Sequence, residues 1–221
     1  MTTTPQGPDG QPPVVARHEQ ILNAALAAIE EHGPGALTGQ IAERAGLARP
    51  NFYRHFSSKD DLDFAVARHA YQELRAEIRA RLDLCGIPLD VIRAPIAAQV
   101  VWADEHQNVY RFLVSRGRQR NSERTAERSD FAAELAAAGG RYFPRFAKDR
   151  DAAEATLVEI IGLVDAYVLR WLSRPNGTRE QLIDRLTTHA WLIIDHHLRE
   201  SGEYVDPLTP ISWHQQVTGP C

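Results

Sequence analysis

Cysteine is scarce in this chain of 221 residues, which contains Cys85 and Cys221 alone. Two such distant cysteines provide neither a disulfide framework nor the paired spacing of a zinc site, so we expect the protein to be located in the reducing cytoplasm. Long apolar runs are missing too, and none approaches the roughly 20 residues that span a bilayer. The stretch MTTTPQGPDGQPP lacks the basic and apolar regions of a secretory signal. Its proline, glycine and threonine content predicts a disordered arm over residues 1–13.

Signatures of catalysis are also missing from the sequence. It has no HExxH pattern, no GxSxG pattern and no glycine-rich phosphate loop. His189 and His197 are eight residues apart on one predicted helix, and two turns are too far for one metal ion without other ligands. We therefore expect no catalytic residue, no metal site, no cofactor and no membrane partner. An enzyme built on a helical bundle is the alternative from another class.

The apolar residues that are present recur at three- and four-residue steps along the whole chain, which predicts an all-α protein. Hydrophobic residues make up 43% of the sequence and charged residues 24%, as in ordinary globular domains. The glycine pair 139–140 interrupts one predicted helix, either as a kink beside a cavity or as a break. We expect helices over residues 14–32, 38–45, a short one from 48, 59–84, 88–105, 108–115, 123–149, 152–173 and 178–201.

One short stretch differs in charge from the rest of the chain, whose formal net charge is −4. Residues 44–59, RAGLARPNFYRHFSSK, carry four basic side chains and no carboxylate. Two short helices joined at AGLA predict a helix-turn-helix, whose second helix fits the major groove of DNA. Phe52 and Phe56 would pack this helix against its neighbours. Any amphipathic helix pair exposes some arginine and histidine, so a plain surface helix remains an alternative for this stretch alone.

The wider stretch 21–62 resembles the TetR family of bacterial transcriptional regulators. The resemblance rests on IAERAGL, FYRHF and SKDDL, which follow one another at close spacing. It implies a three-helix DNA-binding domain and the start of a long fourth helix. It also implies an all-helical C-terminal domain that binds a small molecule and dimerises through its last two long helices.

The resemblance assigns roles to residues of the basic stretch. Arginine and asparagine can pair with base edges, whereas hydroxyl, imidazole and ammonium groups contact phosphates. The sequence departs from the family pattern twice. Ala48 stands where the family commonly has a serine that caps the recognition helix, and LTGQIA is one residue shorter than the usual pattern, which puts contacts from Thr38, Gly39 and Gln40 in doubt. The residues expected to read bases are Arg49, Pro50, Asn51 and Arg54. The residues expected to contact phosphates are Thr38, Tyr53, His55 and Lys59.

The last two predicted helices are apolar on more than one face, which indicates a partner surface. We expect a homodimer with an isologous four-helix contact, and the alternative is a deeply buried monomer core. The predicted organisation is an arm (1–13), a helix-turn-helix domain (14–58), an effector-binding and dimerisation domain (59–204) and a C-terminal tail (205–221). The dimer candidates are Leu157, Ile161, Val164, Val168, Leu182, Leu186, Trp191 and Ile194.

The effector pocket has the weakest sequence signal, because each aromatic candidate could equally be ordinary core. Asp165 lies on an apolar helix, where it could form an interface hydrogen bond or contact a ligand. Few charges occur on these helices, so we expect a hydrophobic or amphipathic effector. The pocket candidates are Gln99, Trp102, His106, Phe112, Phe131, Tyr142, Phe146, Tyr167 and Trp171.

These observations predict a ligand-responsive transcriptional regulator. It would bind a palindromic operator as a homodimer, act as a repressor, and be released by its effector. The alternative is a DNA-binding dimer without small-molecule sensing, in which side chains would fill the cavity.

Overall fold

The computed structural model describes residues 14–48, 54–82, 86–116 and 121–210, and its regular elements in these ranges are all helical. The all-α prediction is thus confirmed. No helix among the described residues is long and apolar enough to cross a bilayer. The elements are α1 (Val14–His32), α2 (Thr38–Arg44), α4 (Lys59–Arg79), α5 (Pro88–Glu105), α6 (Gln107–Arg116), α7 (Asn121–Gly139), the short 3-10 helix η1 (Phe146–Lys148), α8 (Arg150–Ser173) and α9 (Arg179–Glu200).

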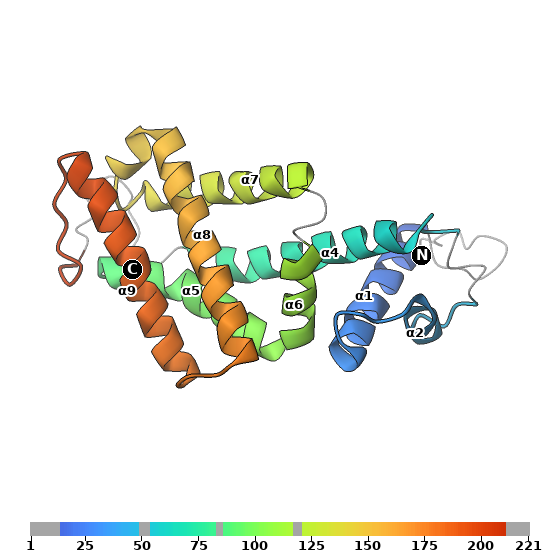
Figure 1. Ribbon diagram of the computed structural model, residues 1–221. Coiled ribbons are helices and arrows are strands. Elements are labelled where there is room, and N and C mark those ends of the chain that lie inside the picture. Colours follow the sequence, from blue (N-terminus) through green and yellow to red (C-terminus); the bar gives the residue numbers. More distant parts are fainter. Residues whose placement is uncertain (1–13, 49–53, 83–85, 117–120, 211–221) are drawn as a thin grey trace, which may run out of the picture.

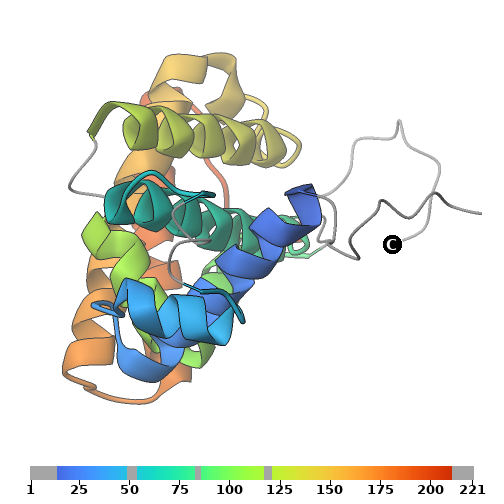
Figure 2. The same ribbon diagram turned by 90° about the vertical axis from the view of Figure 1, so that its right-hand side faces the viewer.

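The long helix α4 connects the two ends of an elongated molecule (Figure 1). Helices α1 and α2 pack at its N-terminal end, and Figure 2 shows these two helices in front of the rest of the bundle. Helices α5, α7, α8 and α9 gather around the other end of α4, while α6 contacts both α1 and α4. One continuous apolar core extends through both groups of helices.

Capping groups explain where α2 and α4 begin and end. The Gln40 amide oxygen accepts the Leu37 N–H at the start of α2, and Gly46, at a φ of +64°, ends it. The Leu47 N–H bonds to the Ala42 carbonyl, the pattern of a Schellman motif that satisfies the last helical carbonyls. Ser58 caps α4, because its hydroxyl accepts the Asp61 N–H at 3.0 Å.

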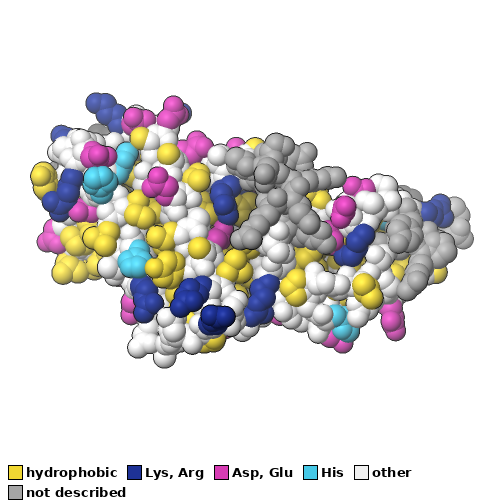
Figure 3. Space-filling model, viewed as in Figure 1, with side chains coloured by type: hydrophobic (Ala, Val, Ile, Leu, Met, Phe, Trp, Pro, Cys, Tyr) yellow, Lys and Arg dark blue, Asp and Glu magenta, His cyan; other side chains and the backbone are white. Residues whose placement is uncertain are grey.

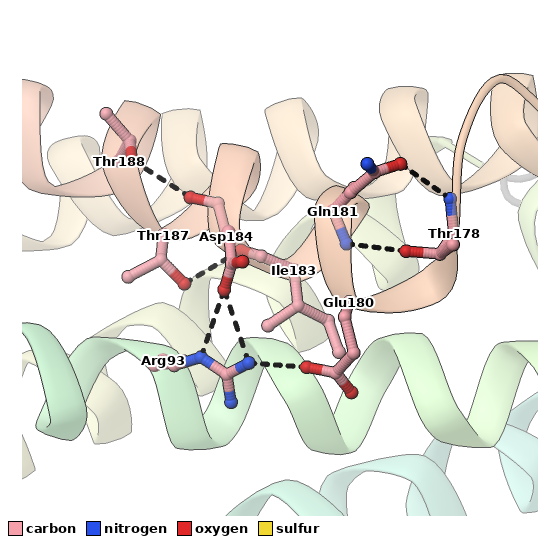
Figure 4. A network of polar contacts seen from close by, with 8 residues as sticks. All are labelled: Arg93, Thr178, Glu180, Gln181, Ile183, Asp184, Thr187 and Thr188. Carbon is pink, nitrogen blue, oxygen red and sulfur yellow. Dashed lines mark hydrogen bonds and ion pairs between the residues drawn. The ribbon is translucent and has the colours of Figure 1, made fainter.

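Polar contacts fasten α5 to α9 (Figure 4). The Arg93 guanidinium of α5 donates to the carboxylates of Glu180 at 2.6 Å and Asp184 at 3.2 Å, both on the first turns of α9. Thr178 caps α9 by accepting the Gln181 N–H, and the Gln181 side chain accepts the Thr178 N–H in return. This reciprocal cap satisfies two N–H groups and fixes the position at which α9 begins.

Two predicted helices are shorter than expected. Helix α4 ends at Arg79 rather than near Leu84. Residues 83–85 lie outside the described residues. The helix expected over 123–149 is wrong beyond Gly139: α7 stops there, and a turn leads into η1. The Tyr142 and Phe143 N–H groups both turn back to the Gly139 carbonyl, and Pro144 cannot donate to a continuing helix. Of the two alternatives for the glycine pair, the structure has the break.

The two glycines at this break have different surroundings, which gives a testable difference in stability. A Cβ atom on Gly140 would lie 2.5 Å from the Ala147 Cβ, whereas one on Gly139 would meet nothing within 4 Å. We expect Gly140→Ala to lower the free energy of unfolding by about 1–3 kcal/mol, as overpacking does. Gly139→Ala is the matched control and should be neutral or slightly stabilising. Urea titration of both variants checks this, and equal midpoints would contradict it.

Candidate DNA-binding surface and internal cavity

The helical end formed by α1, α2 and the start of α4 has its own apolar core. Ile21, Ile41 and Leu62, one from each helix, are fully buried. Phe56 is 5% exposed and its ring lies 4.8 Å from that of His18, as the predicted packing role requires. Residues 49–53 of the predicted second helix, which include Arg49, Pro50, Asn51, Phe52 and Tyr53, lie outside the described residues.

The other predicted DNA-contacting residues have accessible positions at this end. Arg54 is exposed, and His55 and Thr38 are half-buried, with Thr38 as the first residue of α2. The neighbouring Gln40 side chain is occupied in capping α2. Arg44, in contrast, pairs with Glu31 of α1 and thus fastens α2 to α1. Of these two arginines, Arg54 is exposed and Arg44 is engaged in an ion pair.

Lys59 has a structural partner besides any phosphate it contacts. Its ammonium forms an ion pair with Asp63 one helical turn later. The Asp63 side chain is 2% exposed and that of Lys59 33%. Removing one partner of a buried ion pair leaves an uncompensated charge. Replacement of Lys59 would therefore disturb the start of α4 as well as a phosphate contact.

A cavity of about 430 Å³ opens between α4, α6, α7 and α8. We call it the outer cavity. Its volume falls in the range of small-molecule sites, about 300–1,000 Å³. Its described lining is mainly apolar but includes three charged residues on α7 and α8. The lining consists of Tyr71, Leu74, Ile78, Gln99, Leu113, Val114, Glu127, Arg128, Ser129, Phe131, Val158, Ile161, Gly162, Asp165, Ala166 and Leu169.

A second cavity of about 110 Å³, which we call the inner cavity, lies among α4, α5, α7, α8 and α9. Its walls are almost entirely apolar and include Ile92, Ile96, Leu157, Ile160 and Val164. The two cavities share four lining residues: Ile78, Gln99, Phe131 and Ile161. A ligand could therefore extend from the outer cavity into the inner one after a small movement of these side chains.

A buried polar network lies where the two cavities meet. The Asp165 Oδ1 atom accepts from Gln99 Nε2 and from the Tyr110 hydroxyl, each at 2.9 Å. Its Oδ2 atom forms an ion pair with Arg128. The Asp165 side chain is 16% exposed and that of Arg128 is 43% exposed. Burial raises the pKa of Asp165, and Arg128 and the two hydrogen-bond donors counteract part of that rise.

Tyr71 contributes a polar group without a partner to the same cavity. Its hydroxyl oxygen is buried and has no hydrogen-bond partner among the described residues. Burial raises the pKa of Tyr71 to about 12, with a smaller contribution from the Asp165 carboxylate. The phenol is therefore neutral near pH 7 and can both donate and accept a hydrogen bond. A buried polar group of this kind is destabilising unless a ligand or water satisfies it.

The predicted pocket residues divide into three groups. Gln99, Phe131, Tyr142 and Phe146 line the outer or inner cavity. Trp102 and His106, whose rings are 4.9 Å apart, line a separate hollow on the surface. The remaining three line neither cavity: Phe112 is fully buried in the core, the Tyr167 ring packs against His189, and Trp171 donates to the Gly177 carbonyl.

Six of the eight predicted dimer residues are buried within one chain, and the other two, Leu157 and Ile161, are half-buried. Helix α7 packs against α8, and α5 packs against α9. Leu157, Ile161, Val164 and Ile194 line the cavities. Val168, Leu182, Leu186 and Trp191 are each less than 9% exposed within one chain.

Asp165 was expected at an interface or a ligand site, and the structure places it in the cavity wall. Helix α6, which carries its partner Tyr110, also contacts the end formed by α1, α2 and the start of α4, the candidate DNA-binding end. The Glu30 carboxylate of α1 accepts the Asn108 and Val109 N–H groups at 3.4 and 3.2 Å. Asn108 Nδ2 also donates to the Glu30 carbonyl at 2.9 Å. A carboxylate is favoured at a helix N-terminus, so this contact holds α6 against α1.

Sequence reasoning missed Tyr71, Tyr110, Arg128 and Glu30. A signal was available for two of them: Tyr71 lies on the same α4 stripe as Leu74 and Ile78, and Arg128 has the same spacing from Phe131 and Leu135. The Glu30 contact joins residues 78 positions apart, and no local pattern indicates it.

His189 and His197, which raised the enzyme alternative, do not converge. The His189 ring packs against Tyr167, and the His197 ring lies 5.1 Å from that of Phe146. Among the described residues, no three or more histidine, cysteine, aspartate or glutamate side chains lie close enough together to hold a metal ion.

Known proteins share the N-terminal sequence and the fold. Residues 21–66 match the model of bacterial regulatory proteins of the tetR family. An uncharacterised HTH-type transcriptional regulator of Mycobacterium tuberculosis is 26% identical over 183 residues, 80% of this chain and 76% of that protein. An HTH-type transcriptional repressor of the same species is 36% identical over 126 residues, 57% of this chain and 63% of that protein.

A solved structure extends the likeness beyond the N-terminal helices. The regulator FadR from Bacillus subtilis, crystallised in complex with stearoyl-CoA, superposes with a TM-score of 0.58. The two sequences are 16% identical, and the match covers 80% of this chain and 97% of that one. At this identity the likeness concerns the fold alone. The matched N-terminal sequence and the regulator relatives together identify residues 21–66 as the N-terminal region of a TetR-family transcriptional regulator.

Proposed function

We propose that this chain is a ligand-responsive transcriptional regulator that binds a two-fold-symmetric DNA operator as a homodimer. The observation that carries the proposal is the outer cavity, whose polar network includes Tyr110 of α6, the helix that α1 holds through Glu30. A ligand that displaces this network would act on α6, and α6 on the DNA-binding end. Differential affinity of the ligand for two positions of that end is the physical requirement for such a switch.

The proposed organisation keeps the boundaries expected from sequence. Residues 14–58 would bind DNA, 59–204 would bind the effector and dimerise, and 1–13 and 205–221 would flank them. The described part of the tail contacts the bundle, since the Leu89 N–H donates to the Pro207 carbonyl at 3.5 Å. A chromosomal operator implies the cytoplasm as the site of action, and no catalytic role is proposed.

The proposed dimer surface is the outer face of α8 and α9. Figure 3 shows hydrophobic side chains gathered over these two helices. Leu192 of α9 is 59% exposed, and Ala166 of α8 is exposed beside the half-buried Leu163 and Tyr167. The Tyr167 and His189 rings, 5.7 Å apart, join the two helices on this face. Exposed apolar side chains on adjacent helices suit an isologous four-helix contact.

The repressor role and the effector class rest on the relatives and on the cavity. One M. tuberculosis relative is named a repressor, and FadR of B. subtilis was crystallised with stearoyl-CoA. The inner cavity is apolar, whereas the outer one has a polar end, which supports an amphipathic effector. A regulator without sensing would fill this space with side chains, so the outer cavity of about 430 Å³ favours a sensor.

Selection from a pool of random DNA duplexes tests the DNA-binding role. We expect purified protein to enrich a palindrome whose half-sites are about one helical turn apart, roughly 34 Å. Arg54→Ala should relax the preference at one position of each half-site, because a good arginine–guanine pair contributes about 1–3 kcal/mol of discrimination. Arg79→Ala, on the distant end of α4, is the control and should leave the selected sequence unchanged. Enrichment of no sequence would contradict the proposal.

A further inference from the structure

We propose that the effector carries a protonated amine, which replaces Arg128 at the Asp165 carboxylate while its apolar part extends past Phe131 into the inner cavity. The inference rests on the proposed function, since it names the chemical class of ligand for the same cavity. A ligand in the outer cavity would meet two paired charges, Asp165 and Arg128, and they differ in whether they can move away.

Asp165 is a fixed charge. It projects from the middle of α8, and Gln99 and Tyr110 hold one of its oxygens by two hydrogen bonds. Its side chain is 16% exposed, so rotation into water is not open to it. A buried carboxylate needs a cation or a proton, because burial disfavours the charged form.

Arg128, the present counter-ion, is the partner that can leave. Its side chain is 43% exposed, and it reaches Asp165 with one nitrogen of the guanidinium. At this exposure the Arg128 guanidinium can regain water by turning into solvent, whereas Asp165 would stay buried and still need a cation. An ammonium group that enters the cavity could therefore take its place without leaving a buried arginine unpaired.

The other charged and polar side chains around the outer cavity would suit a cationic ligand better than an anionic one. Arg128 is the single cationic side chain of the described lining, so an anion would meet no second cation there. Glu127, also of the lining, pairs with Arg68 at 3.5 Å. Arg75 packs against the Phe131 ring, 4.6 Å from its centre, and pairs with Glu134. The buried Tyr71 hydroxyl can accept a hydrogen bond from an ammonium, which would supply the partner it lacks among the described residues.

The apolar part of the ligand has one direction in which to extend. Gln99, Phe131, Ile78 and Ile161 line both cavities, and Gln99 is itself bonded to Asp165. A group anchored at Asp165 is therefore next to the passage into the inner cavity. That cavity is lined by aliphatic and aromatic side chains, so an alkyl or aryl group gains free energy by leaving water there.

Three probes with the same tail test the head group: n-octylamine, n-octanol and n-octanoate, titrated calorimetrically into the full-length protein at pH 7. We expect octylamine to bind at least about ten-fold more tightly than the other two, the factor expected for a charge-assisted hydrogen bond. Asp165→Asn, which keeps an acceptor for Gln99 and Tyr110, should remove this preference. Arg128→Gln, which removes the competing cation, should strengthen octylamine binding.

The opposite pattern would overturn the proposal. If octanoate binds best, Arg128→Gln abolishes its binding and Asp165→Asn strengthens it, then Arg128 is the anchor and the effector is an anion. Equal binding of all three probes would also overturn it. Circular dichroism of each variant shows whether it is folded. Release of the operator is measured separately: tight octylamine binding without release contradicts the proposed switch, whereas release by octanoate alone contradicts the amine.

Discussion

Replacing Leu192 with glutamate should convert dimers of this chain into monomers. Leu192 is the exposed leucine on the outer face of α9, the proposed dimer surface. An isologous contact uses the same patch on both subunits, so the change would bury two carboxylates in an apolar contact. Operator affinity should fall at least about a hundred-fold, because the second half-site loses the benefit of linkage to the first.

Leu208→Glu is the matched control for this change. Leu208 is 66% exposed, similar to Leu192, but it follows α9 in the tail segment rather than lying on α8 or α9. Analytical ultracentrifugation and operator titration of both variants provide the measurement. If Leu192→Glu remains a dimer, or if both variants dissociate equally, the dimer surface lies elsewhere.

Replacing Glu30 with alanine should disconnect the cavity from the DNA-binding end. Glu30 provides the carboxylate and the carbonyl by which α1 holds the N-terminus of α6, and Tyr110 follows two residues after Asn108. In the wild type, a cavity ligand should change operator affinity by about 5–150-fold, the usual range of coupling. In Glu30→Ala that factor should fall to about two-fold or less, with ligand affinity itself little changed.

Glu31→Ala is the control, since Glu31 has the same charge on the same helical turn but pairs with Arg44 of α2 rather than with α6. It should keep the ligand response even if operator affinity changes. The readout is the ratio of operator dissociation constants with and without ligand. An undiminished ratio in Glu30→Ala would show that coupling takes another route, of which α4 is the obvious candidate, because it extends from the DNA-binding end to the cavity.

Local patterns in the sequence predict much of this fold. The Ser58 cap, Gly46 at the end of α2 and the apolar spacing of α5 and α9 each involve neighbours within one or two helical turns. Such features depend on nearby residues alone. The overlong α7 shows the limit: the periodicity continues past Gly139, but the helix ends there, where the close packing of Gly140 against Ala147 leaves no room for a side chain.

The site was less predictable, because it depends on which faces the chain itself covers. The apolar residues of α8 indicated a partner, yet Leu157 and Val164 face cavities of their own chain. Gln99 and Phe131 were expected in the pocket and line it, whereas Phe112 is simply core. The partners of Asp165 come from three other helices, and periodicity within α8 cannot identify them.

Thermodynamic reciprocity between ligand and operator tests the central claim most directly. A compound is first chosen from a screen of amphipathic molecules by one criterion: Ile161→Trp, which fills the junction of the two cavities, abolishes its binding. Its dissociation constant is then measured with free protein and with protein saturated with the selected operator. We predict weaker binding to the operator complex, by the same factor as the ligand weakens operator binding. Equal affinity in both states would contradict the account, because a cavity ligand that does not distinguish them cannot regulate DNA binding.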